Sequence, residues 1–361
     1  MKRLASVILF VLLSACAKPE PEQQLINDMA YKVIIPAHDA FLSSAKNLTR
    51  RSQQLCENPQ SAQVLEETRS AWLQAMLDWQ VLKMINFGPV TNDNMAWKIQ
   101  FWPDKKNLVR SKAEALLSSD QVLTLETMEA QSVTIQGLTA IEYLLFDEQG
   151  AVKLSGTTDK AEARRCQLLF VTARHTEKVA NGLHHAWVKE GYVKTFLSPG
   201  EKNPVYTDPA QLMGQLLGAL VANLEQVKKY NLESPMGLGG TKAKANPYLN
   251  EAWRSRYSKE LLIARINGLH DLYRGGQGYG FDDYLRAKPG HKELNDSLDA
   301  HFLKAVSALE SLDKPLFDEV QGHSDTLQRV LVEISALLSE TRYGVTQAAG
   351  VTLGFNANDG D

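Results

Sequence analysis

Thr139 and Glu142 are the first residues whose types and spacing suggest chemistry. They stand three apart in the segment Gly137–Tyr143, and residues three apart share one face of a helix. A histidine and a glutamate at this spacing could present an imidazole nitrogen and a carboxylate oxygen to one metal ion. In this sequence the first of the two positions is Thr139, and a threonine hydroxyl is a poor ligand for a soft or borderline divalent metal ion. Glu142 is then left as a single protein ligand, which does not make a zinc site.

The histidines supply no substitute set of metal ligands that is local in the sequence. Of the eight, only His323 has an acidic residue three or four positions away, which is Glu319. His184 and His185 are adjacent, so on a helix they diverge by about 100° and do not grip one ion together. The motifs HExxH and GxSxG are also absent from the sequence. We therefore predict no catalytic residue, no metal ligand and no cofactor. The alternative is a metallopeptidase whose histidine and glutamate ligands are assembled from distant parts of the chain.

The elements that must position these residues are predicted to be helices throughout, which makes the fold class all-α. The long segments repeat apolar residues at helical spacing, and none alternates with a period of two. Helices of this length with short connections pack as up-and-down bundles, in which each helix buries an apolar stripe. We predict helices at about 26–56, 60–86, 160–190, 251–273 and 291–310, and two more after the start signals Thr207–Pro209 and Ser324.

A break near the middle of the chain suggests two domains. Residues 197–206 are rich in proline and glycine, a composition typical of a linker. We predict an N-terminal helical bundle over 25–196 and a C-terminal helical bundle over 207–361. A short similarity between Gly137–Tyr143 and Gly268–Tyr273 raises the hypothesis that the two bundles arose by duplication.

The first residues have the composition of a bacterial lipoprotein signal peptide. Lys2 and Arg3 precede an apolar run that is too short to span a bilayer as a helix. The run ends in Leu-Ser-Ala-Cys, which resembles a lipobox, so we predict that residues 1–15 are removed and that Cys16 carries acyl chains that anchor the protein to a membrane. Residues 16–24 then form a tether. Because the residue after the cysteine is not aspartate, the predicted location is the outer membrane, facing the periplasm.

Two further cysteines, Cys56 and Cys166, remain after the anchor is counted. In an oxidising periplasm, two leftover cysteines are more often paired than free. We predict a disulfide between them, and the alternative is two separately buried thiols.

The charge balance of the chain argues against a nucleic-acid partner. Among its 361 residues, 39 are Lys or Arg and 42 are Asp or Glu. No basic stripe interleaved with aromatic residues stands out in the sequence, and such a stripe is the usual footprint of nucleic-acid binding.

The segment Gly137–Tyr143 resembles the GxHxxE signature of the imelysin family, with Thr139 at the histidine position. The family comprises bacterial cell-envelope proteins, among them a metallopeptidase group and iron-regulated lipoproteins. The resemblance covers essentially the whole mature chain. It implies two helical bundles, with the signature and the stretch around Arg254 facing one another near their interface. Three further stretches carry the resemblance, namely Phe101–Asp104, Glu251–Ser255 with Ser258, and Thr352–Asp361.

The resemblance implies that three groups meet at the interface of the two bundles. They are the carboxylate of Glu142, the hydroxyl of Thr139 and the guanidinium of Arg254. One interpretation is a pocket for a small polar ligand or a metal chelate. The other is a structural clamp, in which Glu142 and Arg254 form an ion pair that docks the two bundles. Trp102 and Trp253 either pack at the interface or offer stacking surfaces. The candidate ligand-binding residues are Thr139, Glu142, Trp102, Arg254, Ser255 and Ser258.

The expected function is therefore that of a non-proteolytic binding or accessory lipoprotein in iron or other metal acquisition. The iron connection is what the resemblance implies. The alternatives are the metallopeptidase described above and a purely structural protein that partners another envelope protein.

Overall fold

The computed structural model describes residues 20–146, 160–240 and 244–353, and in these residues the fold is all-α, with no β-strand. This confirms the predicted fold class. The helices are α1 (Pro21–Asp28), α2 (Ile35–Glu57), α3 (Ala62–Leu82), α4 (Met95–Ile99), α5 (Leu108–Leu117), α6 (Leu125–Glu129), α7 (Leu138–Leu145), α8 (Lys160–His184), α9 (Tyr192–Leu197), α10 (Pro209–Gln226), α11 (Ser234–Met236), α12 (Ser258–Arg274), α13 (Phe281–Arg286), α14 (Lys292–Glu310), α15 (Leu316–Gln321), α16 (Asp325–Ser339) and α17 (Thr346–Ala349).

Seven shorter helical segments connect or extend these helices. Those of the π type add a residue to a turn without interrupting the helix. They are η1 (Met29–Ile34), η4 (His185–Lys189), η5 (Val227–Glu233) and η7 (Glu340–Val345), whereas η2 (Gly88–Asn94), η3 (Val133–Ile135) and η6 (Pro247–Leu249) are 3₁₀ turns.

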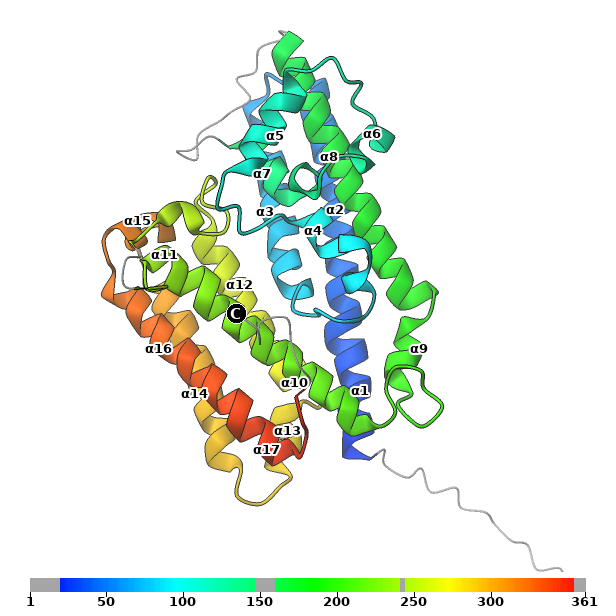
Figure 1. Cartoon of the computed structure of the whole chain (residues 1–361), viewed down its shortest axis with the longest axis vertical. Coiled ribbons are helices and arrows are strands. Elements are labelled where there is room, and N and C mark those ends of the chain that lie inside the picture. The colour runs from blue at the N-terminus through cyan, green and yellow to red at the C-terminus, as the bar shows by residue number, and fades with distance from the viewer. Residues whose placement is uncertain (1–19, 147–159, 241–243, 354–361) are drawn as a thin grey trace, which may run out of the picture.

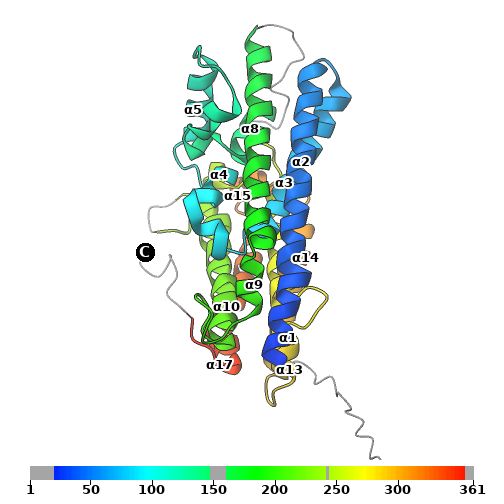
Figure 2. The ribbon, with the colours of Figure 1, turned by 90° about the vertical axis from the view of Figure 1, so that its right-hand side faces the viewer.

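One hydrophobic core lies among the long helices α2, α3 and α8. The helix α2 packs against both others, and the two views of the molecule show α2 and α8 as adjacent rods (Figures 1 and 2). Phe41, Trp72 and Trp79 fill this core and are almost completely buried. The short helices α4 to α7 pack onto α8 at one end of it.

A second hydrophobic core lies among α10, α12, α14 and α16 (Figure 1). Its side chains include the buried Tyr273 and Phe302. The two cores meet where α12 packs against α3. At that contact Gly268 allows close approach, because a Cβ at this position would lie 2.7 Å from Met84 Cε. Below, α1–α9 are called the first half of the chain and α10–α17 the second half.

The first helix starts earlier than the sequence predicts and serves both cores. α1, η1 and α2 form one uninterrupted helix from Pro21 to Glu57. Residues 21–24 therefore belong to a helix and not to the predicted tether, because Pro21 at the first helical position favours a helix start. Leu25 and Ile26 lie in the second core, whereas Phe41 lies in the first.

The start signal predicted before α10 is confirmed. Asp208 is the N-cap, and its side chain accepts a hydrogen bond of 2.8 Å from the backbone N–H of Gln211. The prediction of a helix over 251–273 is wrong at its start, because α12 begins at Ser258 and residues 251–256 form turns. Two residues in these turns have left-handed backbone conformations, Ala252 (φ 53°) and Arg256 (φ 67°), which a continuous helix excludes.

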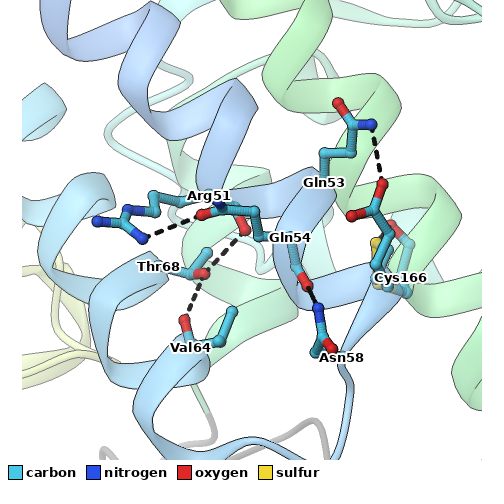
Figure 3. The surroundings of a disulfide bond; sticks show 9 residues. Arg51, Gln53, Gln54, Asn58, Val64, Thr68 and Cys166 are labelled. Atoms are coloured by element: carbon cyan, nitrogen blue, oxygen red, sulfur yellow. Dashed lines mark hydrogen bonds between the residues drawn. A yellow bond between two sulfur atoms is a disulfide. The ribbon is translucent and has the colours of Figure 1, made fainter.

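The predicted disulfide between Cys56 and Cys166 is present, with a Cα–Cα distance of 5.5 Å. It joins the end of α2 to α8 (Figure 3). Close to it, α2 and α3 are held together by Thr68, whose hydroxyl donates to the carbonyl of Arg51 over 3.1 Å (Figure 3).

The predicted signal peptide and the anchor residue Cys16 lie outside the described residues, as do residues 354–361 of the matching carboxyl-terminal stretch. Among the helices that the structure describes, none combines the length and the apolar character needed to cross a membrane.

Candidate functional site

The Gly137–Tyr143 segment forms the start of α7, a helix that is buried on every side. Thr139 and Glu142 lie on it as the spacing predicts, and only 2% of the surface of Glu142 is exposed. Gly137 precedes the helix at a very close backbone contact, because a Cβ there would lie 2.1 Å from the carbonyl oxygen of Ile99. The glycine of the signature is thus required by packing against the segment that leads to Trp102.

The turns at 251–256 bring the second half of the chain to Glu142. Glu142 Oε1 accepts two hydrogen bonds of 2.9 Å, one from the backbone N–H of Ser255 and one from its hydroxyl. The hydroxyl of Ser258 donates to the backbone carbonyl of Glu251 over 2.5 Å and so closes the turn. The left-handed residues Ala252 and Arg256 cost about 1 to 3 kcal/mol each, which these hydrogen bonds help to offset.

Arg254 is buried but its guanidinium does not lie in an open pocket. It lies 4.2 Å from the ring centroid of Trp253 and 5.4 Å from that of Tyr143. One of its terminal nitrogens donates a hydrogen bond to the side chain of Asn107. Stacking on two rings and a bond to an amide fix the orientation of this cation.

Burial dominates the electrostatics of Glu142. It raises the pKa of the carboxyl above its usual value, against the positive charge of Arg254 and the hydrogen bonds from Ser255. Thr139, Glu142, Trp102 and Arg254 surround a cavity of only about 20 Å³, which has room for about one water molecule. We call it the Glu142 cavity.

This donor set does not fit a metal ion. Thr139 and Glu142 supply one hydroxyl and one carboxylate, and Glu142 Oε1 already accepts two hydrogen bonds. A catalytic zinc site requires about three protein ligands. Within the described part of the chain, no three residues of the types His, Cys, Asp and Glu are grouped so that they could hold one ion.

A larger polar cluster, which the sequence did not reveal, lies beside the Glu142 cavity. Its centre is Glu251, a carboxylate that is 3% exposed. Oε1 accepts hydrogen bonds from Gln80 (2.7 Å), Lys83 (2.7 Å) and Gln100 (2.6 Å), and Oε2 accepts one from Asn231 (3.2 Å). We call these five residues the Glu251 network, and they join α3 and the segment after α4 to η5 and the turns at 251–256.

Arg265 of α12 extends this network in the second half. It is 1% exposed, and its terminal nitrogens donate to Asn223 (2.9 Å), Gln226 (2.8 Å) and Asn231 (3.4 Å). Its Nε is also buried and has no hydrogen-bond partner among the described residues. The cation is therefore oriented by amide oxygens and keeps an unused donor.

Glu251, Lys83 and Arg265 stabilise one another's charged forms. Burial by itself would raise the pKa of Glu251, but the charges of Lys83 and Arg265 and the hydrogen bonds from Lys83 and Gln100 outweigh it and hold the pKa at about 2. Burial lowers the pKa of Lys83 to about 8 and that of Arg265 to about 10, and the charge of Glu251 opposes both shifts. At neutral pH the network and Arg265 together therefore contain one anion, Glu251, and two cations, Lys83 and Arg265.

A cavity of about 390 Å³ opens next to the network, between the two halves of the chain. We call it the interface cavity. Three cationic side chains line it, those of Lys83, Lys105 and Arg265, and no Asp or Glu of the described part of the chain is among the residues that line it. Trp102 and Tyr230 stand on its wall with their rings at 82° and their centroids 6.4 Å apart.

Of the predicted site residues, only Trp102 lies at both cavities. Asp104 anchors its loop by accepting bonds from the backbone N–H groups of Leu108 (2.7 Å) and Val109 (2.9 Å) at the start of α5. A signal for the missed residues does exist in the sequence. Arg265 interrupts the apolar stripe of α12, and a lone cation on a buried helix face requires buried partners.

Comparison with known proteins gives this architecture a family. The family model Peptidase_M75, described as Imelysin, matches residues 34–342. Iron-regulated protein A of Synechococcus elongatus is 24% identical over 315 residues, which cover 84% of this chain and 80% of that protein.

Two solved structures share the fold. An imelysin-like protein from Psychrobacter arcticum has a TM-score of 0.75 and 19% sequence identity, with coverage of 93% of this chain and 97% of that one. A protein from Parabacteroides distasonis has a TM-score of 0.77 at 14% identity, with the same coverage of both chains. The family model spans most of the chain, from the middle of its first helix to the last turn before α17, and with this match the chain belongs to the imelysin family.

Proposed function

We propose that this protein is a non-proteolytic lipoprotein of the cell envelope that takes part in iron acquisition by binding a small ligand between its two halves. In this proposal the ligand occupies the interface cavity, and Glu142 and Ser255 dock the halves beside it. Membership of the imelysin family and the similarity to a protein named for iron regulation support the iron-related role.

The interface cavity is the observation that carries the proposal. Its volume of about 390 Å³ is within the range of small-molecule sites. Buried charged side chains from both halves surround it, and such groups are costly to keep unless they are paired or used for binding. The Glu142 cavity, at about 20 Å³, is too small for such a ligand.

The state of Glu142 supports the non-proteolytic part of the proposal. A metallopeptidase requires a water-activating base and a metal with an open coordination position. Here Thr139 replaces the histidine of the signature, and Glu142 Oε1 is engaged by Ser255. The carboxylate is thus placed for docking and not for activating water.

Iron-limited growth tests the proposed role. We expect a deletion strain to grow more slowly than its parent when ferric iron is chelated, and equally well when iron is in excess. Complementation with the intact gene should restore growth. A deletion strain whose growth is independent of iron would reject the iron-related role.

The non-proteolytic part needs a separate test on purified protein. Metal analysis combined with peptidase assays before and after treatment with a chelator should give no chelator-sensitive cleavage. Stoichiometric zinc together with cleavage that the chelator abolishes would instead establish the metallopeptidase.

The membrane anchor is tested in cells through Cys16. Wild-type protein should fractionate with the outer membrane and carry acyl chains on its first mature residue. The variant Cys16→Ala should lose both properties, and wild-type protein found only in the soluble fraction would reject the anchor.

A further inference from the structure

The charges around the interface cavity indicate the sign of its ligand. Lys83, Lys105 and Arg265 line it, and the carboxylate of Glu251 bonds to Lys83 and acts on the charge of Arg265. Among the residues that the structure describes, no Asp or Glu lines the cavity itself. One carboxylate against three cations leaves an excess of positive charge in a partly enclosed space. Such a space attracts and retains anions.

Two of these cations have hydrogen-bonding capacity to spare. Lys83 Nζ carries three donors, and it bonds to Glu251 over 2.7 Å and to Gln100 over 3.4 Å. Arg265 has a buried Nε without a partner among the residues that the structure describes. Lys83 therefore keeps one N–H that can donate to an anionic acceptor in the cavity, and the guanidinium of Arg265 on the cavity wall adds its positive charge.

Aromatic side chains form the rest of the wall. Lys83 Nζ lies 5.8 Å from the ring centroid of Trp102, and Lys105 Nζ lies 5.9 Å from that of Tyr230. Trp97 also lines the cavity and is 44% exposed. Flat aromatic walls next to cations suit a ligand that has a planar apolar part and a charged end.

We propose that the interface cavity binds a small aromatic carboxylate. Its carboxylate lies toward Lys83 and Arg265, and its ring lies against Trp102 and Tyr230, with Lys105 adding positive charge. The proposal deepens the proposed function, on which it rests for placing the ligand in this cavity, by naming the chemical class of that ligand. It requires neither iron nor a metal ion for binding.

Calorimetry with three matched probes tests the ligand class on the full mature chain. Salicylate has both the ring and the carboxylate, phenol lacks the carboxylate, and acetate lacks the ring. We expect saturable binding of salicylate that is at least about tenfold tighter than that of phenol or acetate, because charged hydrogen bonds of this kind contribute about 1.5 to 3 kcal/mol. Inorganic phosphate tests for a general anion site.

Variants then place the ligand. Lys105→Gln removes a cation of the cavity without touching the Glu251 network and should weaken salicylate binding about fivefold. Lys229→Gln is the matched control, since Lys229 Nζ lies 5.4 Å from the same Tyr230 ring but is not a cavity-lining residue. Tyr230→Leu keeps apolar volume and should also weaken binding by removing the aromatic face.

Several outcomes would overturn the inference: no saturable binding of salicylate, equal binding of phenol, equal binding of acetate or phosphate, or equal effects of the Lys105 and Lys229 variants. Its failure is separable from that of the proposed function. Iron-dependent growth without salicylate binding rejects the ligand class only, whereas salicylate binding without an iron phenotype rejects the iron role only.

Discussion

Glu142 is a buried carboxylate that accepts two hydrogen bonds from Ser255. Replacing it with alanine should destabilise the fold by about 2 to 4 kcal/mol, because the two donors lose their acceptor and a small void is left. Glu142→Gln keeps an acceptor oxygen and should recover most of that loss. Urea unfolding of the three proteins measures the difference. If alanine and glutamine cost the same, the hydrogen bonds to Ser255 do not stabilise the docking of the two halves.

Wild type and Glu142→Gln should also differ in how their stability depends on pH. The pKa of Glu142 is raised in the folded state above its ordinary value of 4.5 because the side chain is buried, so the folded protein holds this proton more tightly than the unfolded chain. Its contribution to stability is complete below pH 4.5 and is lost as the pH rises through the folded pKa. Wild type should therefore lose stability relative to Glu142→Gln as the pH rises above 4.5. A constant difference between the two proteins from pH 4 to 8 would contradict this.

Glu251 is the counter-charge of two buried cations, Lys83 and Arg265. Glu251→Gln should destabilise the protein by about 3 to 5 kcal/mol, because both cations lose the buried anion whose charge stabilises them. Adding Lys83→Met to this variant should restore part of the stability, since one unpaired charge is then removed. A double-mutant cycle by chemical unfolding measures the coupling, and additive effects would show that Glu251 and Lys83 act independently.

The loss of stability at low pH depends on the same carboxylate, that of Glu251. The folded pKa of Glu251 is about 2, below its ordinary value of 4.5, so the contribution of Glu251 to stability is present above pH 4.5 and is lost as the pH falls toward 2. Loss of stability over this range should be smaller in Glu251→Gln than in wild type.

Residue by residue, the sequence located part of this region. The spacing of Thr139 and Glu142 placed both on one helical face, and the resemblance brought them near Arg254 and Ser255. It did not indicate that the backbone N–H and the hydroxyl of Ser255 donate hydrogen bonds to the carboxylate, since this depends on the backbone path through the turns. Lys83 and Glu251 are 168 residues apart, and no local pattern pairs them.

At the scale of elements, Gly137 sets how α7 meets the segment before Trp102. Gly137→Ala should destabilise the protein by about 1 to 3 kcal/mol or more, because its Cβ would lie 2.1 Å from the carbonyl oxygen of Ile99. Gly218→Ala in α10 is the control, where a Cβ meets nothing within 4 Å. There alanine should stabilise by about 0.5 to 1 kcal/mol through its helix propensity. Thermal unfolding compares the two, and equal stability changes would contradict the close contact.

Apolar periodicity predicted the long helices well but not their ends or interruptions. The predicted helix over 251–273 extended an apolar pattern through residues that in fact turn, with Ala252 and Arg256 in left-handed conformations. The π segment η5 carries Tyr230 to the interface cavity and Asn231 to Glu251. A single extra residue in a turn leaves no signature in composition, although π segments are frequent at functional sites.

At the scale of the whole molecule, the disulfide ties α2 to α8 across a sequence separation of 110. Replacing Cys56 and Cys166 together with alanine should lower the free energy of unfolding by about 3 to 5 kcal/mol, since a long loop in the unfolded chain is no longer closed. Urea unfolding with and without reductant measures this. Reductant should shift the midpoint of the wild type and leave the variant unchanged, and an unchanged wild type would contradict a stabilising disulfide.

The global architecture was the most predictable level. The all-α class follows from periodicity that persists over most of the chain, and the disulfide follows from the number of cysteines and the expected compartment. The division into two hydrophobic cores does not coincide with the predicted linker at 197–206. Leu25 and Ile26 precede this linker in the sequence but pack with residues of the second half. The sequence does not show which core the start of the first helix joins, since its apolar stripe could pack against either core.

The uninterrupted helix from Pro21 to Glu57 restricts how the two halves move. At 1.5 Å per residue it is about 55 Å long, and it is embedded in both hydrophobic cores. Hinge opening about the 197–206 loop would require this rod to bend. The π segment η1 (Met29–Ile34) lies in the second core, just before the rod enters the first core at Ala37. If the proposed ligand enters between the halves, we expect the halves to move by small sliding and twisting of packed helices around this shared helix.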